Sequence, residues 1–380
     1  MMQFPIHTIH VEESVRHTEI TRRVLDRLAD QAAVEYVPDA RSVINQYDLR
    51  RGAHRRGKQA LLLSDFHSAP IKPCPSTPEY LCCEYQILNF GAGCPLDCSY
   101  CILQDYFSNP LMVVQANPDA FLEAAAREIR SQPERFFRLG TGEFADSLAL
   151  DPLTGYAKRL IEFIRGFPNA LLELKTKAVY VDDILRLDHC GRTVCAWSVN
   201  SADVVRREEI HAASLDARFD AARQCQEAGY RLAFHFDPII YSPGWEEGYR
   251  KTVKRIFEVA RPDNIVWISL GCFRYTPGLE KTIRERFPGN RYTFDEFIMG
   301  GDGKMRYPQP LRIHIYRKMI QWIREYGGDK VLVYFCMENP AVWQQVMGRV
   351  PTDNDELASW LDASGGWKKP GAQSAPIPPA

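Results

Sequence analysis

The stretch Cys94-Pro-Leu-Asp-Cys98-Ser-Tyr-Cys101 decides the fold, because it closely follows an apolar run, 83–90, that is predicted to be a β-strand. In parallel barrels the loops after the strands gather at one end and carry the active-site residues. Three thiolates in so tight a loop can each ligate one iron of a [4Fe-4S] cube, whereas most such clusters take four cysteines. The spacing therefore predicts that Cys94, Cys98 and Cys101 hold a [4Fe-4S] cluster with one iron open.

An open iron at a reductive cluster suits S-adenosylmethionine (SAM), whose amine and carboxylate can chelate it while an electron breaks the bond from the sulfonium to C5′. The cofactor then supplies the radical chemistry, and the protein positions the substrate hydrogen. The alternative is a structural zinc site, which normally closes with four Cys or His ligands in paired spacing. His67 and Cys74 lie upstream at no matching interval, which disfavours zinc.

Along the chain from residue 83 onward, short apolar runs alternate with amphipathic helical stretches. This pattern is typical of βα units around a parallel sheet. Strands are expected at 83–90, 136–140, 171–174, 194–199, 231–236 and 265–270. Helices are expected at 118–130, 153–165, 181–187, 215–228 and 245–260. Six repeats are fewer than a closed eight-fold barrel needs. The sequence therefore predicts an α/β fold, a partial (βα)6 TIM barrel with N- and C-terminal extensions.

The extensions flank a barrel expected over 81–340, which also includes a helix at 310–326 and a strand at 331–335. Residues 1–80 are expected to form an N-terminal extension with one helix over 15–36 and a basic segment, 50–58. Residues 341–380 are expected to hold a short C-terminal helix and a tail, from 364, whose Gly, Pro and Ala content predicts disorder.

Composition narrows the class of protein. The chain has 380 residues, a formal net charge of −1 and 45% hydrophobic residues, so no global basic field draws it to nucleic acid. The N-terminus lacks the features of a signal peptide, and no apolar run reaches membrane-spanning length, so no membrane partner is expected. Eleven cysteines without a secretory signal indicate a reducing compartment, and we expect a cytoplasmic location.

The C-x3-C-x2-C spacing, with an aromatic residue before the last cysteine, resembles the signature of the radical SAM superfamily. The stretch 137–143, which ends in Gly140, Gly142 and Glu143, resembles the superfamily motif whose backbone and carboxylate receive the SAM amino group. Glycines at this point let the backbone approach a ligand, although a simple turn is the alternative. Lys177 could pair with the SAM carboxylate as a point charge, or it could be a solvated surface lysine.

Polar residues at the ends of two later strands are further candidates. Ser198 and Asn200 follow the strand at 194–199 and could meet the SAM ribose, although strand-end capping is an equal alternative. His235 and Asp237 alternate along one strand and so face the same side. Ionisable side chains in that position favour a pocket over a buried structural pair.

Several later motifs are similar to those of the spore photoproduct lyase family, radical SAM enzymes that reverse a thymine lesion in DNA. The similarity runs in order from about residue 85 to 335 and includes the stretches 98–104, 146–154, 176–177, 198–201, 227–230, 237–241 and 244–249. It implies a carbon–carbon lyase that uses SAM and a [4Fe-4S] cluster. It also implies a DNA or nucleotide substrate and an electron donor such as flavodoxin or ferredoxin.

Two positions depart from the family. Its hydrogen-donor cysteine, on the loop after the second strand, is replaced by Glu143, and a carboxylate has no weak S–H bond to donate. Tyr100 stands before the last cluster cysteine and is a catalytic candidate, but the family's second relay tyrosine is replaced by Ile102. Cys272, after the sixth strand, could serve as another donor, although a buried structural cysteine is the alternative.

DNA binding would need local features. The segment 50–58 could bind phosphates, and the aromatic residues Tyr241, Trp245, Phe273 and Tyr275 could stack an extruded base. The absent donor cysteine leaves open a family member with a diverged substrate, such as a small molecule, another nucleotide or a peptide. A non-enzymatic iron–sulfur protein is less well supported, because the SAM-site residues are present.

Overall fold

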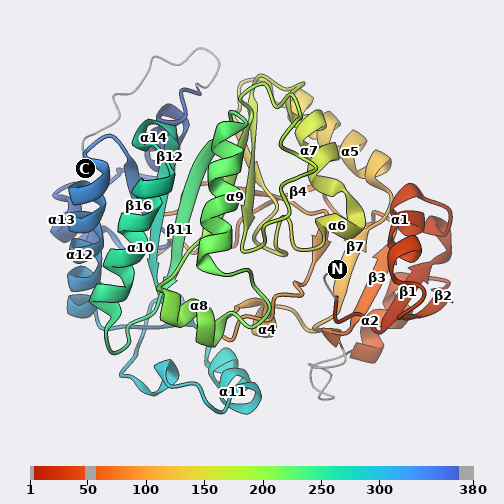
Figure 1. Ribbon diagram of the computed structural model, residues 1–380, viewed down its shortest axis with the longest axis horizontal. Helices are drawn as coiled ribbons and strands as arrows, with labels where there is room; N and C mark the ends of the chain where they lie inside the picture. The colour runs from red at the N-terminus through yellow and green to blue at the C-terminus, as the bar shows by residue number, and fades with distance from the viewer. Residues whose placement is uncertain (1–3, 48–56, 368–380) are drawn as a thin grey trace.

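The computed structural model describes residues 4–47 and 57–367. Its central feature is an eight-stranded sheet with the order β16-β12-β11-β10-β9-β8-β5-β4, in which only β4 runs antiparallel to its neighbour. The strands are β4 (Ile71–Pro73), β5 (Gln86–Leu88), β8 (Phe137–Gly140), β9 (Ala170–Thr176), β10 (Thr193–Ser198), β11 (Arg231–Ile239), β12 (Ile265–Cys272) and β16 (Leu332–Phe335). The six expected strands are β5 and β8–β12, in consecutive order, so the predicted open α/β barrel is confirmed (Figure 1).

The sheet is buried because helices cover its outer face. Every residue of β12 is buried, as is usual for parallel strands packed on both sides. The helices around the sheet are α5 (Pro118–Ser131), α6 (Asp151–Thr154), α7 (Tyr156–Ile164), α9 (Leu215–Glu227), α10 (Trp245–Val259), α12 (Gln309–Gly327) and α13 (Pro340–Met347). α14 (Asn354–Ser364) instead meets the side of the sheet that faces the barrel interior, where Arg138 of β8 donates to Asp362 at 3.0 Å. The expected helix at 153–165 is divided because Gly155 adopts a left-handed conformation, φ 66°. The expected helix at 181–187 is wrong, since this stretch forms only turns.

The N-terminal extension differs from the expected single helix and basic segment. It contributes a second sheet with the order β2-β1-β3-β7-β6, in which the first four strands are parallel. Its elements are β1 (Thr8–Glu12), α1 (Glu19–Leu28), β2 (Ala33–Val37), α2 (Ala40–Ile44), β3 (Ala60–Ser64), β6 (Gly91–Ala92) and β7 (Met112–Gln115). The expected helix over 15–36 was too long, because 33–37 pairs as a strand beside β1. Since β6 and β7 lie beyond residue 80, this sheet draws on both expected segments.

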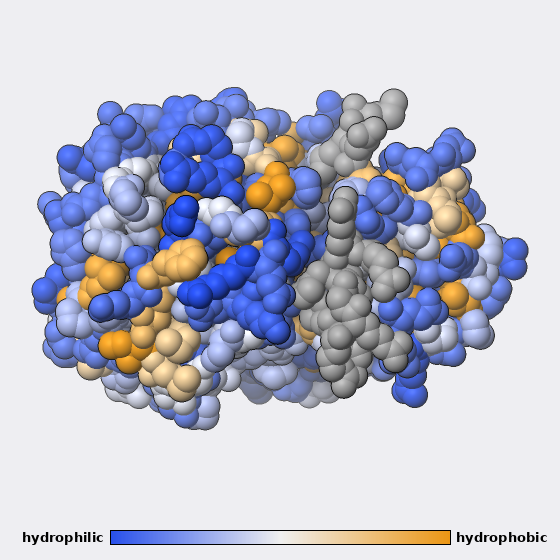
Figure 2. All heavy atoms as spheres, turned by 90° about the horizontal axis from the view of Figure 1, so that it is seen from below, coloured by the Kyte–Doolittle hydropathy of each residue, from blue (hydrophilic) through white to orange (hydrophobic). Residues whose placement is uncertain are grey.

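The chain between β12 and α12 forms a small sheet and a helix that the sequence patterns did not predict. It consists of β13 (Arg274–Tyr275), α11 (Pro277–Arg286), β14 (Ile298–Met299) and β15 (Met305–Arg306), with the three strands paired antiparallel. α11 packs against α4 (Leu103–Tyr106), and it lies at the lower edge of Figure 1, below α4 and α8 (Ala202–Glu208). The face seen from below is mostly hydrophilic, with separate hydrophobic patches (Figure 2).

Two features expected from the sequence, the basic segment and the C-terminal tail, lie largely outside the described residues. Arg50, Arg51, Arg55 and Arg56 of the basic segment lie outside the described residues, as does most of the tail expected to be disordered, 368–380. Within the described ranges, no helix has both the length and the apolar character needed to span a membrane.

Candidate active site

A cavity of about 530 Å³ lies where the cysteine loop meets the carboxyl ends of the central strands. Its lining brings together most of the residues singled out from the sequence, which supports an active site at this end of the barrel. The expected site residues that line it are Cys94, Cys98, Tyr100, Cys101, Gly142, Glu143, Lys177, Ser198, His235 and Asp237. Gly140, Asn200 and Cys272 do not line it.

The backbone of the cysteine loop is held by polar side chains from elsewhere in the chain. Lys58 Nζ donates to the carbonyl of Cys94 at 2.6 Å, and Gln104 Nε2 donates to the carbonyl of Cys98 at 3.1 Å. Asp97 adopts a left-handed conformation, φ 50°, and its carboxylate accepts from Arg286 at 2.8 Å. The loop is therefore fixed before any ligand binds.

Two ammonium groups lie near the buried thiols of this loop. Burial raises the pKa of Cys94 to about 12, and burial also raises the pKa of Cys98, while the nearby Lys58 and Lys177 favour the thiolates. In the part of the chain that the structure describes, no three Cys, His, Asp or Glu side chains converge as one metal ion requires. A closed zinc site needs four such ligands around one ion, whereas the three thiolates of a cube each meet a different iron.

A buried ion pair supports the loop from below. Tyr100 Oη donates a short hydrogen bond to Glu209, and Arg218 forms a short ion pair with the same carboxylate. The side chains of Glu209 and Arg218 are fully buried. The backbone of Glu209 also pairs with Cys98 in an isolated β-bridge. Tyr100, expected to be catalytic, is therefore at least a structural partner of this network.

The loop after β8 is shaped by close packing. A Cβ added to Gly140 would lie 1.4 Å from Tyr85 Oη, so this glycine makes room for a tyrosine and is not itself part of the cavity lining. A Cβ on Gly142 would lie 2.7 Å from Cβ of Lys175, at the end of β9.

Glu143 and Lys175 form a short ion pair, and although burial alone would lower the pKa of Lys175, Glu143 raises it overall. Lys175 is thus a charged cavity residue that the sequence reading missed.

The end of β9 is fixed by Asp146. Its Oδ2 accepts from the backbone N–H of Lys177 at 2.7 Å, and its Oδ1 accepts from Thr176 Oγ1 at 2.6 Å. Lys177 Nζ lies 5.7 Å from the centroid of the Tyr100 ring. The ammonium of Lys177 therefore lies near the cysteine loop inside the cavity.

The two candidates at the end of β10 separate. Ser198 reaches the cavity. Asn200 is 1% exposed and accepts a short hydrogen bond from Tyr249, while its Nδ2 donates to the carbonyl of Pro238 at 2.8 Å. The expected ribose contact of Asn200 is therefore not supported, because its amide is used to join β10 to β11 and α10.

His235 and Asp237 both face the cavity, but each has its own partner. His235 Nε2 lies 2.7 Å from Glu173, which also accepts from Trp267 at 3.2 Å. Asp237 pairs with Arg274 at 3.1 Å. Burial would raise the pKa of Glu173, but His235 and Lys175 lower it overall. Glu173 with His235 and Asp237 with Arg274 are thus two separate pairs within the cavity.

Cysteines supply the clearest difference from the sequence reading. Cys272 is 2% exposed and lies outside the lining, so it is not placed as an alternative donor. Four other thiols line the cavity instead, those of Cys74, Cys82, Cys83 and Cys336. In the sequence, only the adjacency of Cys82 and Cys83 could have drawn attention to these four cysteines. Of the four aromatic candidates, only Phe273 reaches the cavity.

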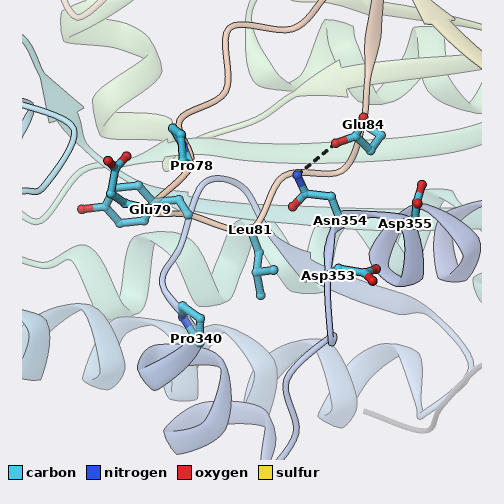
Figure 3. Close-up of a pocket in the computed structure, with 9 residues that line it drawn as sticks. Pro78, Glu79, Leu81, Glu84, Pro340, Asp353, Asn354 and Asp355 are labelled. Atoms are coloured by element: carbon cyan, nitrogen blue, oxygen red, sulfur yellow. Dashed lines mark hydrogen bonds between the residues drawn. The ribbon is translucent and has the colours of Figure 1, made fainter.

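A second pocket, of about 470 Å³, lies beside the turn that carries Cys82 and Cys83 (Figure 3). It is lined by carboxylates such as Glu79 and Asp353, and Asn354 donates to Glu84 across it at 2.9 Å. It shares none of the residues expected for radical chemistry, so it is not the catalytic cavity.

The chain is similar to proteins of one known family. Residues 75–336 match the family model of spore photoproduct lyase. The chain is similar to spore photoproduct lyase of Geobacillus sp. (strain Y412MC61), 34% identical over 219 residues, and to that of Bacillus subtilis (strain 168), 31% identical over 217 residues. Each match covers 56% of this chain and 63% of the relative, so the chain matches less than two thirds of those relatives' length.

A solved structure of spore photoproduct lyase complexed with dinucleoside spore photoproduct superimposes with a TM-score of 0.76 at 25% identity. That match covers 88% of this chain and all of the other. The resemblance expected from the motifs is confirmed, and the chain belongs to the spore photoproduct lyase family, within the radical SAM superfamily.

Proposed function

We propose that the protein is a radical SAM lyase that holds a [4Fe-4S] cluster on Cys94, Cys98 and Cys101 and acts on a thymine lesion of the spore-photoproduct type. The observation that carries the proposal is that all three cysteines line one cavity together with the ends of β9, β10 and β11. When bound, the cluster and SAM supply reductive cleavage of the sulfonium to a 5′-deoxyadenosyl radical. The electron comes from a reductase of the flavodoxin or ferredoxin class.

The chain's own residues bind and orient the reactants. Gly142 lets the backbone approach the SAM amino group, and Glu143 offers it a carboxylate. Lys177 presents an ammonium to the SAM carboxylate, with its backbone fixed by Asp146. Ser198 offers a hydroxyl for the ribose. The role of each residue is a proposal, supported by its place in the cavity lining.

The remaining cavity residues bind the substrate. The ion pair of Asp237 with Arg274 and the hydrogen bond between His235 and Glu173 keep the cavity polar. Phe273 adds an apolar surface on which a base can stack. These groups exclude bulk water from the reacting carbon once substrate is seated.

A second candidate is a family member with a diverged, non-DNA substrate. The ion pair between Glu143 and Lys175 favours it, since the resemblance puts Glu143 at the position of the family's donor cysteine. A carboxylate held by an ammonium there changes both the hydrogen source and the charge offered to the substrate.

The test uses the full-length protein, reconstituted anaerobically with iron and sulfide. It is mixed with SAM and dithionite, with or without synthetic dinucleoside spore photoproduct, and 5′-deoxyadenosine and repaired dinucleotide are measured by chromatography. Repair supports the lyase assignment. Formation of 5′-deoxyadenosine with untouched dinucleotide supports the second candidate, and no 5′-deoxyadenosine overturns both.

Two cysteine variants control the assay. Cys98→Ala is expected to lose the brown cluster and SAM cleavage. Cys190→Ala changes an exposed cysteine outside the cavity lining and is expected to retain both. A cluster-loaded, active Cys98→Ala protein would contradict the assignment of the cluster ligands.

A further inference from the structure

One wall of the catalytic cavity is built from thiols that come from distant parts of the chain. Cys74 follows β4, Cys82 and Cys83 lie on the connection to β5, and Cys336 follows β16. All four thiols line the same cavity. We call Cys74, Cys82, Cys83 and Cys336 the thiol wall.

The thiol wall is held rigidly by its backbone. The N–H of Cys74 donates to the carbonyl of Tyr85 at 2.9 Å, and the N–H of Cys336 donates to the carbonyl of Leu270 at 2.9 Å. Asn354, at the start of α14, accepts from the N–H of Cys82 at 2.8 Å and donates to Glu84, as Figure 3 shows for the second bond. The thiols therefore occupy fixed positions in the cavity.

A tyrosine hydroxyl stands beside this wall with no assigned use. Tyr85 is 6% exposed and lines the cavity, yet its buried Oη has no hydrogen-bond partner among the described residues. Leaving such a group unpaired costs about 1–3 kcal/mol, so it calls for an explanation. Gly140 keeps the space for it, because any Cβ there would meet Tyr85 Oη at 1.4 Å.

The environment keeps both groups protonated. Burial raises the pKa of Cys74, and the nearby carboxylate of Glu143 raises it further. Burial likewise raises the pKa of Tyr85 well above its usual range, with Glu173, Glu143 and Cys74 adding to the effect. A thiol that remains S–H is a donor of hydrogen atoms, whereas a thiolate is not. Cys74 is the thiol that lies opposite Tyr85 where β4 and β5 pair, because Pro73 faces Gln86 and the N–H of Cys74 donates to the carbonyl of Tyr85.

We propose that Cys74 donates the hydrogen atom that quenches carbon radicals in the cavity and that Tyr85 restores it. In the first step the S–H bond of Cys74 breaks, a C–H bond forms on the radical carbon, and a thiyl radical remains on sulfur. In the second step the O–H bond of Tyr85 breaks, the S–H bond reforms, and a phenoxyl radical remains. One electron from the low-potential reductase and one proton from solvent then restore Tyr85.

This inference rests on the proposed radical SAM function, but its test needs no lesion substrate. Thiol hydrogens exchange with solvent, so in D2O the donor carries deuterium. The reconstituted protein is incubated in D2O with SAM and dithionite alone, and 5′-deoxyadenosine is analysed by mass spectrometry. Wild-type protein is expected to give mainly monodeuterated 5′-deoxyadenosine.

The variants separate the two steps. Cys74→Ala and Cys74→Ser are each expected to lower the monodeuterated fraction at least fivefold, since neither side chain has a weak bond to hydrogen; the serine keeps the size and polarity of the site. Tyr85→Phe is expected to keep the deuterium but to stop near one turnover. Cys225→Ala, which removes a buried thiol from α9, is expected to match wild type.

The outcomes are distinct. Absence of 5′-deoxyadenosine from wild-type protein would overturn the proposed function, and the inference with it. Normal 5′-deoxyadenosine that carries no deuterium, or an unchanged deuterium fraction in both Cys74 variants, would overturn the inference alone. Undiminished multiple turnover of Tyr85→Phe would remove Tyr85 from the relay.

Discussion

The buried pair between Arg218 and Glu209 offers the sharpest test of how the cysteine loop is held. Arg218 lies on α9, and its guanidinium donates to the carbonyls of Ala213 and Ser198 at 3.0 Å each, besides its ion pair with Glu209. Both charged side chains are fully buried. Arg218→Met keeps much of the side-chain volume but leaves the Glu209 carboxylate without its cation.

The expected loss of stability follows from the burial of this ion pair. Removing one partner of a buried pair costs about 3–5 kcal/mol, because an uncompensated charge stays in the interior. The total stability of a folded domain is about 5–15 kcal/mol, so the loss is a large part of it. Glu209 also holds Tyr100 and pairs with the backbone of Cys98, so the cysteine loop loses its support. We therefore expect less iron bound per chain as well.

The assay is urea unfolding followed by tryptophan fluorescence and by circular dichroism, whose coincidence would justify two-state treatment. Arg223→Met on the same helix is the matched control. Arg223 is 46% exposed and pairs with Glu227 at 3.0 Å, and such surface pairs contribute less than about 1 kcal/mol. Arg218→Met with Glu209→Leu should recover part of the loss, because both charges are gone. A single Arg218→Met change within about 1 kcal/mol of wild type, with full iron content, would refute the reasoning.

Two further predictions concern packing and pH. Gly140→Ala should push Tyr85 aside and cost about 1–3 kcal/mol of the free energy of unfolding, whereas Gly289→Ala, with nothing within 4 Å, should be neutral; equal melting temperatures would contradict this. Burial raises the pKa of Asp151 to about 6 from 3.8, so the folded state binds more protons between these values and stability falls as pH rises through them. Asp151→Asn keeps an acceptor for the N–H of Ala157. It should therefore stabilise the protein by about 2–3 kcal/mol above pH 6 and have no effect below pH 3.8. A variant that becomes more stable than wild type as the pH falls would contradict this direction.

Local patterns in the chain predicted much of the barrel. Parallel strands buried on both faces are short, continuous apolar runs, so 171–174 and 265–270 could be recognised without knowing their neighbours. Helix starts were equally local, as with Asn117 capping α5 and Pro118 at its first position. The second sheet was missed because β1 (TIHVE) and β2 (AVEYV) mix polar with apolar residues and lack the continuous apolar runs that marked the barrel strands.

Within the candidate site, the sequence favoured residues that stand at strand ends. This rule found Ser198, His235 and Asp237, all of which line the cavity. It failed for Asn200 and Cys272, because a strand end can also point a side chain into the packed layer between sheet and helix. Lys175 was missed since its partner, Glu143, lies on the neighbouring strand's loop.

The cysteine loop, the open α/β barrel and the family could be predicted from the chain alone, because each depends on spacing within a few residues or on a run of motifs in order. That Cys74, Cys83 and Cys336 share one wall, and that Gly140 leaves space for Tyr85, follows from the folded structure. Periodicity describes which face a residue takes within its own element. Which faces meet is set by the packing of segments up to 262 residues apart, such as those of Cys74 and Cys336, and no local pattern encodes it.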